Sequence, residues 1–205
     1  NLHNIVKINE EPFSGLPVIA YFLCLKNCSN TKVNLDGSGL DEAHSGYDKY
    51  FNKNLSLENN LYSSQDGTKS VIKNITNKKF IDQGYDLSIN NFSLPFNNNL
   101  DNSKYLDMFY LKLPRALRFR DKFSMSLGKE LRPCFLDTQL IASLFKLKKS
   151  EQYNRGFGKF FLRNIYKDDL SKSIAFSKKR NIQTPQSFWF KHTLVSWLDN
   201  FLKNA

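Results

Sequence analysis

The chain has 205 residues with 40% hydrophobic and 14% aromatic content, which excludes an intrinsically disordered protein and suffices for a buried core. No run of about 18 apolar residues is present and no basic segment precedes an apolar one at the start, so neither a membrane span nor a signal peptide is expected. The net charge of +11 suggests an anionic partner, but the lysines are spread along the chain instead of forming a basic block.

A helix followed by a short strand is predicted near the start of the chain. Apolar residues over 15–29 recur at helical spacing, and Ser14 is a candidate cap for that helix, which would be buried. Val33 and Leu35 then indicate a short strand. This order of elements is typical of an α/β protein.

A glycine-rich turn follows that strand. Gly37 and Gly39 permit positive φ angles and let the backbone approach a ligand closely. Residues 40–52 predict a helix with Asp41 and Glu42 in its first turn, where the helix dipole favours acids. The turn and the start of this helix therefore form a candidate ligand site.

The rest of the chain is predicted to be mainly helical. Residues 53–101, rich in Asn, Ser and Lys, predict a mobile insertion or long connection with one short helix. Helical patterns then return over 105–111, 113–127, 136–147, 157–166 and 186–203. The predicted class is α/β, mostly helical around one or few parallel strands.

Carboxylates surround the opening of the glycine turn. Asp36 stands at the strand end, and Asp41 and Glu42 follow the turn. Mg²⁺ in proteins binds through one or two carboxylates plus the phosphates of a substrate, so this arrangement can serve a nucleotide. The alternative is an ordinary strand–turn–helix junction in which the acids cap the helix.

Further motifs follow in order along the chain. Residues 113–137 read LPRALRFRDKFSMSLGKELRPCFLD, residues 156–166 read GFGKFFLRNIY, and residues 178–185 read KKRNIQTP. Together with VNLDGSGLDEAHSGY at 33–47, they resemble the C-terminal synthetase domain of glutamine-hydrolysing asparagine synthases.

Each motif carries part of that resemblance. The family's L-[SD]-G-x-G-x-D-E-x-x-x-G-Y pattern is matched by residues 35–47, and its K-x-x-L-R by residues 159–163. Its basic stretch ending in proline resembles residues 179–185, and its E-P-F resembles residues 11–13. The family's D-R-x-S-M-x-x-x-x-E-x-R-x-P-F-L-D pattern is matched by Asp121, Ser124, Met125, Glu130, Arg132, Phe135, Leu136 and Asp137.

The resemblance implies a fold and an activity. The fold would be an adenine-nucleotide α-hydrolase-like domain, incomplete in this chain, and the activity that of an ATP-dependent carbon–nitrogen ligase. ATP would activate the aspartate side-chain carboxylate as an acyl-adenylate, and glutamine-derived ammonia would then attack. ATP and Mg²⁺ are the implied cofactors.

The resemblance also implies roles for individual residues. Asp36, Gly37 and Gly39 would contact the nucleotide, with Arg163 supporting the cluster. Asp41 and Glu42 would hold Mg²⁺. Lys159 would stabilise the adenylating transition state and pyrophosphate.

Three positions depart from the family pattern. Cys134 occupies the expected proline position, with Pro133 one place early. Ser38 stands where the synthases carry an acid tied to forming the acyl-adenylate, so its catalytic role and the identity of the carboxylate are in question. Ser45 replaces a glycine of the usual G-G-Y.

Residues 1–205 are therefore interpreted as a partial synthetase domain. The family's S-G-G-x-D-S loop and its glutaminase domain are absent from this sequence. We expect a fragment, or one half of a split protein, and we expect the fragment alone to be inactive.

The expected partners are aspartate or another carboxylate, and ammonia from a glutaminase domain on the missing part or another chain, with a homodimer as one assembly. An odd number of cysteines argues against a disulfide framework and favours a cytoplasmic location. Neither nucleic acid nor a membrane is expected to be a partner. The alternative function is a non-catalytic, basic module, a degenerate relative that binds nucleotide or nucleic acid.

Overall fold

The structure is a computed structural model that describes residues 2–11, 15–28, 31–51, 56–58, 90, 92–179 and 184–203. Ser14, most of the predicted insertion at 53–101 and parts of the motifs at 11–13 and 179–185 lie outside the described residues. The chain divides into two compact units. Unit 1 comprises residues 1–34, 119–131 and 180–205, and unit 2 comprises residues 35–118 and 132–179.

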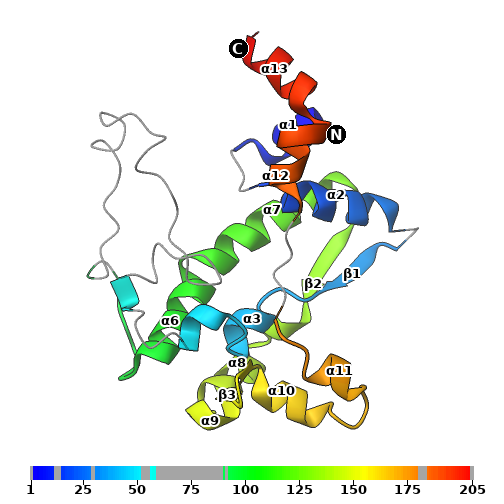
Figure 1. The fold of residues 1–205 in the computed structure, drawn as a ribbon. Helices are drawn as coiled ribbons and strands as arrows, with labels where there is room; N and C mark the ends of the chain where they lie inside the picture. The colour runs from blue at the N-terminus through cyan, green and yellow to red at the C-terminus, as the bar shows by residue number, and fades with distance from the viewer. Residues whose placement is uncertain are drawn as a thin grey trace. The chain divides into compact units, whose positions relative to one another are not determined.

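The elements up to the middle of the chain are, in order, α1 (Leu2–Asn9), α2 (Pro17–Asn27), β1 (Val33–Asp36), α3 (Leu40–Ala43), η1 (Asp48–Phe51), α6 (Asn99–Phe109) and α7 (Lys112–Ser126). The remaining elements are β2 (Glu130–Pro133), η3 (Cys134–Leu136), α8 (Thr138–Phe145), α9 (Lys149–Gln152), β3 (Tyr153–Asn154), β4 (Phe157–Gly158), α10 (Phe160–Ile165), α11 (Lys172–Ala175), α12 (Gln186–Phe188), η4 (Trp189–Thr193) and α13 (Val195–Lys203). Helices account for most of the described residues, as predicted (Figure 1).

Unit 1 is built on an apolar core between helices. Ile5 of α1 and Phe22 of α2 are almost fully buried against Phe123 of α7. The rings of Phe22 and Phe123 meet edge to face with centroids 5.5 Å apart, a favourable aromatic geometry. Among the described residues of α13 none is buried, although Trp197 and Phe201 stack on one another.

Unit 2 has a core made by short helices. Ala43 of α3, Met108 of α6, Leu113 of α7 and Leu144 of α8 form its main buried cluster. Polar and charged side chains are buried beside this cluster to an unusual extent, including Lys49, Lys104 and Asp107. These buried charges need partners inside the protein, because an unpaired charge in an apolar interior is strongly unfavourable.

The strands in the described part of the chain form two small sheets. β1 and β2 pair in a small parallel sheet, and Figure 1 shows the two arrows alongside one another. β3 and β4 form a short antiparallel hairpin in which Tyr153 lies opposite Gly158. The predicted combination of many helices with few parallel strands is therefore confirmed, whereas the specific α-hydrolase-like fold stays a prediction.

Most predicted helices are present near their expected bounds. α2 begins with Pro17 at its first turn, and α7 carries Pro114 in its first turn, where the missing N–H of proline costs no helical hydrogen bond. Asp137 caps α8, and its carboxylate accepts a hydrogen bond from the Leu140 backbone N–H at 2.9 Å. Within the described ranges, no helix is long and apolar enough to cross a membrane.

One helix is much shorter than predicted. The expected helix over 40–52 ends at Ala43, and the chain resumes helical geometry only in η1. Ser45 adopts a left-handed conformation with φ of +55°, which breaks the helix. The break turns Gly46 back toward Asp41, whose backbone carbonyl accepts a hydrogen bond from the Gly46 N–H at 2.7 Å.

Candidate functional site

The end of β1 presents an open backbone turn. Asp36 accepts two hydrogen bonds from Ser38, one from the backbone N–H at 2.8 Å and one from the hydroxyl. A Cβ atom added at Gly37 would meet no other atom within 4 Å. Gly37 therefore leaves its backbone accessible to a ligand, although it does not adopt the positive φ that the sequence allowed.

Gly39 has a different role from Gly37. Its φ of +86° is in the glycine-favoured region, and an added Cβ would collide with Leu136. Leu136 belongs to the second sequence block, and its neighbour Phe135 packs edge-on against His44 with ring centroids 6.2 Å apart. The structure thus brings the motifs at 33–47 and 113–137 together, with Gly39 serving helix packing.

An ion-paired cluster of three residues lies beyond this turn. One Asp41 carboxylate oxygen lies 2.7 Å from the Lys159 ammonium, and the other lies 2.6 Å from the Lys179 ammonium. The Asp41 side chain is 24% exposed and each lysine side chain is 19% exposed, so the cluster is reachable from solvent. We call these three residues the lysine clamp.

The lysine clamp carries surplus positive charge. Burial raises the pKa of Asp41, but the adjacent ammoniums of Lys159 and Lys179 outweigh that effect and hold the pKa below its ordinary value. The carboxylate is therefore ionised at neutral pH. Two ammoniums and one carboxylate leave one net positive charge, as an anion site requires.

Two glycines allow the backbone to approach this cluster. A Cβ atom added at Gly46 would overlap the Asp41 carboxylate and the Lys159 side chain. A Cβ atom added at Gly158 would lie 2.5 Å from the Ser45 carbonyl oxygen. The turn after α3 can therefore pack beneath the ion pair only because both positions lack a side chain.

The backbone also fixes Lys159. Its N–H donates to the His44 carbonyl at 3.1 Å, and its φ of +56° is left-handed at the start of α10. Such a conformation is strained for a residue with a side chain, and the surrounding packing has to maintain it. The predicted catalytic lysine is thus aimed at Asp41 by local backbone geometry.

The guanidinium of Arg163 bonds to backbone carbonyls and not to the clamp. Its Nε donates to the Gly158 carbonyl at 2.8 Å and another guanidinium nitrogen donates to the Ala175 carbonyl at 2.5 Å. Burial lowers its pKa without making it neutral. Arg163 therefore connects β4, α10 and α11, and its supporting role at the site stays a prediction.

Glu42 points into the interior, and not at the clamp. It is 4% exposed and accepts a hydrogen bond of 2.6 Å from the Tyr47 hydroxyl. Burial raises its pKa. Its surroundings suit a structural carboxyl group.

As arranged here, these acids do not fit the predicted magnesium site. Both Asp41 oxygens are paired with lysines, and Glu42 is held by Tyr47. Among the residues that the structure describes, no group of three or more potential metal ligands is close enough to hold an ion. A magnesium site on Asp41 stays a prediction, and it would require the lysines to move away.

A second set of lysine–carboxylate contacts is closed to solvent. Lys49 and Asp107 lie 2.6 Å apart and both side chains are fully buried, with the Tyr50 hydroxyl donating to Asp107 at 2.9 Å. Nearby, Lys112 lies over the Tyr47 ring at 5.1 Å, and burial lowers its pKa to about 7. These groups form a buried network in unit 2.

Sequence reasoning missed one residue of the clamp, Lys179, and one residue that packs against it, Gly46. Lys179 was noted within the basic stretch at 179–185 but was given no role. Gly46 belongs to the G-Y end of the first motif, and its closeness to Asp41 could be inferred only from the helix break at Ser45. The remaining signal for both was their position inside matched motifs.

Comparison with known proteins gives one result. A family model described as asparagine synthase matches residues 1–205. No curated protein and no solved structure matches the chain. The match spans both sequence blocks and every residue of the clamp.

Proposed function

The chain belongs to the asparagine synthase family, and on that premise we propose that it is the ATP-using part of a carbon–nitrogen ligase. The lysine clamp would receive the phosphates of ATP. The observation that carries this proposal is the convergence of Lys159 and Lys179 on Asp41 within 2.7 Å. These three residues come from separate motifs and meet at one accessible place.

The proposed reaction is the activation of a carboxylate. A carboxylate oxygen attacks the α-phosphorus of ATP, the bond to the bridging oxygen breaks, and pyrophosphate leaves as an acyl-adenylate forms. Ammonia then attacks the acyl carbon and AMP departs. The carboxylate would be that of aspartate or a related acid.

Lys159 and Lys179 would act on the leaving group. Negative charge grows on pyrophosphate as the bond breaks, and fixed ammoniums stabilise that charge without having to reorganise. Asp41 would hold the two ammoniums in place before ATP binds, since its two oxygens contact one lysine each. Phosphate oxygens would then compete with Asp41 for these donors.

The open turn at Gly37 would lie close to the nucleotide. Its backbone is free of side-chain obstruction, and Ser38 is fixed by Asp36. Ser38 supplies a hydroxyl and no charge, so we propose that it positions substrate by hydrogen bonding. The acceptor carboxylate could then differ from aspartate.

The rest of the reaction would need other protein parts. Ammonia would come from a glutaminase domain, either on the same protein or on a partner chain, and a homodimer is one assembly to test. Magnesium would have to be held by phosphates and by residues other than Asp41 and Glu42 as they are arranged here.

ATP–pyrophosphate exchange tests the proposed function. The protein purified from its natural source should incorporate labelled pyrophosphate into ATP when aspartate or a related carboxylate is present. Absence of exchange with every carboxylate tried would contradict the catalytic proposal.

The binding-module alternative predicts a different result. Under it, nucleic acid or nucleotide binds without exchange, and nucleic-acid affinity falls steeply with salt. Lys49 and Lys104 are fully buried, so these two cations are not available to such a surface. A salt titration with single-stranded and duplex DNA separates the two functions.

A further inference from the structure

The side chain of Gln152 connects two helices to the turn beneath the lysine clamp. Gln152 ends α9 and is 3% exposed. Its Oε1 accepts a hydrogen bond from the Ser45 hydroxyl at 2.5 Å and another from the Lys104 ammonium at 2.9 Å. Its Nε2 donates to the Leu147 carbonyl at 2.8 Å.

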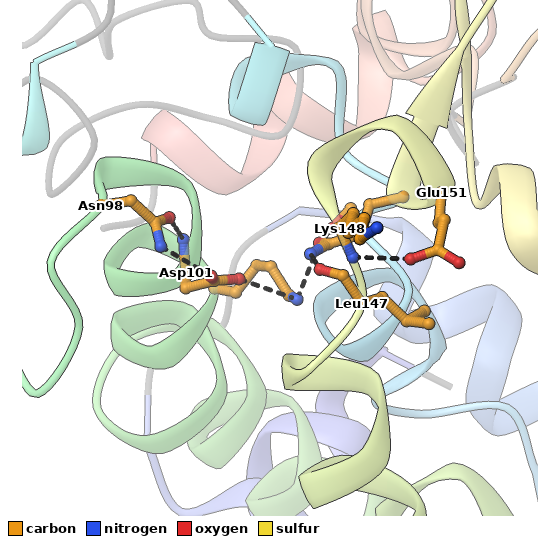
Figure 2. A network of polar contacts seen from close by, with 8 residues as sticks. Asn98, Asp101, Leu147, Lys148 and Glu151 are labelled. Atoms are coloured by element: carbon orange, nitrogen blue, oxygen red, sulfur yellow. Dashed lines mark hydrogen bonds and ion pairs between the residues drawn. The ribbon is translucent and has the colours of Figure 1, made fainter.

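Figure 2 shows the surroundings of this network. Asp101 on α6 and Leu147 before α9 lie on opposite sides of the network. The dashed lines between them are the hydrogen bonds of Lys104 and Gln152. Asn98 fixes Asp101 by donating to its carboxylate at 2.8 Å, and Glu151 accepts a hydrogen bond from the Lys148 N–H at 2.7 Å. Both ends of the network are therefore anchored on helix termini.

The amide of Gln152 can adopt only one orientation here. Two donors face its oxygen and a carbonyl faces its nitrogen. A flipped amide would place an N–H group against an ammonium and a carbonyl against a carbonyl. Gln152 is thus rigid, and so is the Ser45 hydroxyl that it holds.

Ser45 is the strained residue of the turn. It has no solvent exposure and a φ of +55°, a conformation that L-residues rarely adopt. The next residue is Gly46, whose Cα faces the Asp41 carboxylate and the Lys159 side chain so closely that a Cβ would overlap both. A shift of Ser45 would therefore move the Gly46 backbone, against which the Asp41–Lys159 ion pair packs.

We propose that Gln152 is a positioning residue for the Asp41–Lys159 ion pair, acting through Ser45 and Gly46. The buried Lys104 holds the Gln152 oxygen in place, with Asp101 at 3.3 Å as its counter-charge. The effect on phosphate binding rests on the proposed function. The effect on the geometry of the ion pair does not.

The first experiment observes the ion pair without any ligand. Side-chain ammonium signals in ¹H–¹⁵N NMR are visible when a lysine is firmly ion-paired and protected from rapid exchange. In the wild type, signals are expected from Lys159 and from Lys49, whose pair with Asp107 lies elsewhere in unit 2. Lys49 is the internal reference for folding.

Two variants interrupt the proposed connection. Gln152→Leu removes every hydrogen bond of the amide, and Ser45→Ala removes only the hydroxyl, leaving Lys104 and Gln152 paired. We expect the Lys159 signal to broaden beyond detection in both while the Lys49 signal stays. Ser143→Ala and Gln139→Leu, at exposed positions of α8, are the matched controls and should change neither signal.

An unchanged Lys159 signal in Ser45→Ala would overturn the proposal. If Gln152→Leu also loses the Lys49 signal, it has unfolded, and Ser45→Ala decides alone because it removes a single neutral hydrogen bond. Loss of both the Lys159 and the Lys49 signals in Ser45→Ala would also contradict the proposal, since it would show that the Ser45 hydroxyl supports the whole fold.

The second experiment uses inorganic pyrophosphate as the probe. Calorimetric titration of Ser45→Ala should show about tenfold weaker binding than the wild type, because misplaced groups lose much of their effect. Failure of the wild type to bind pyrophosphate would count against the proposed function alone. The NMR result would still decide whether Gln152 positions the ion pair.

Discussion

Two of the lysine–carboxylate sites of unit 2 have nearly equal contact distances and opposite accessibility. The Lys49–Asp107 pair is 2.6 Å apart with neither side chain exposed. The contacts of Asp41 with Lys159 and Lys179 measure 2.7 and 2.6 Å, but the side chains keep about a fifth of their surface in solvent. Distance alone therefore does not separate a structural ion pair from a functional one.

Charge balance separates the two sites. Lys49 is matched by Asp107, which also accepts a hydrogen bond from Tyr50, so its charge is neutralised inside the protein. Asp41 faces two lysines and leaves one positive charge uncompensated at an accessible place. A closed, balanced pair stabilises a fold, whereas an open, unbalanced one can bind an anion.

The largest expected difference between the sites is in stability. Asp107→Asn should lower the free energy of unfolding by about 3–5 kcal/mol, because it leaves the Lys49 charge buried without a counter-charge. Asp41→Asn should lower it by only about 1 kcal/mol, since the clamp is partly hydrated. Urea denaturation of both variants measures the difference. Equal losses would show that the clamp is as structural as the buried pair.

The next largest effect concerns two glycines, Gly46 beside the clamp and Gly37 in the open turn at the end of β1. Gly46→Ala should destabilise the protein by about 3 kcal/mol, because the new methyl group overlaps Asp41 and Lys159. Gly37→Ala should leave stability within about 0.5 kcal/mol, since nothing occupies the space of its Cβ. Thermal unfolding of both variants measures the difference. If Gly46→Ala is as stable as the wild type, the turn can move away from the ion pair.

His44 makes the stability of the protein depend on pH. Burial, with the charges of Lys159 and Lys104, lowers the pKa of His44 to about 4 from an ordinary value of 6.5. The unfolded chain therefore takes up this proton first as pH falls, and stability present above pH 6.5 is lost toward pH 4.

The size of this loss should be about 2 kcal/mol at pH 4.5 relative to pH 7. His44→Gln should reduce that part of the pH dependence, and His192→Gln serves as the control. Denaturation curves at several pH values test this. If His44→Gln loses stability with falling pH as much as the wild type does, groups other than His44 cause the acid sensitivity.

The smallest effect is on anion affinity at the clamp. Asp41→Asn removes the carboxylate that competes for Lys159 and Lys179, so metal-free pyrophosphate should bind a few-fold more tightly, on the order of 1 kcal/mol. Titration calorimetry at low salt gives the constant. Weaker binding by the variant would indicate that Asp41 contributes more by holding the two ammoniums in place than it costs by competing for them.

Several features of the fold followed from the sequence because local rules decide them. Apolar spacing located α2, α7 and α8, and the ends of α7 and α8 agree with helix-end chemistry. The short strand at Val33 was likewise visible from its pattern. These features depend on neighbouring residues in the chain.

The site was only partly predictable because its geometry depends on distant contacts. Asp41 and Lys159 were identified through motifs, and the structure brings them together. The break at Ser45 was not predicted, because the Ser45 hydroxyl bonds to Gln152, 107 residues away, and local spacing does not show such a contact. For the same reason Glu42 looked like a metal ligand, although Tyr47 holds it in the interior.

The central claim is that Lys159 and Lys179 form a polyphosphate site, and pyrophosphate titration of lysine variants tests it most directly. Lys159→Met and Lys179→Met should each weaken binding by about tenfold or more, because a charge-assisted hydrogen bond contributes about 1.5–3 kcal/mol. Lys178→Met, at the exposed neighbouring position, should bind like the wild type. Equal affinities for all three variants and the wild type would contradict the account.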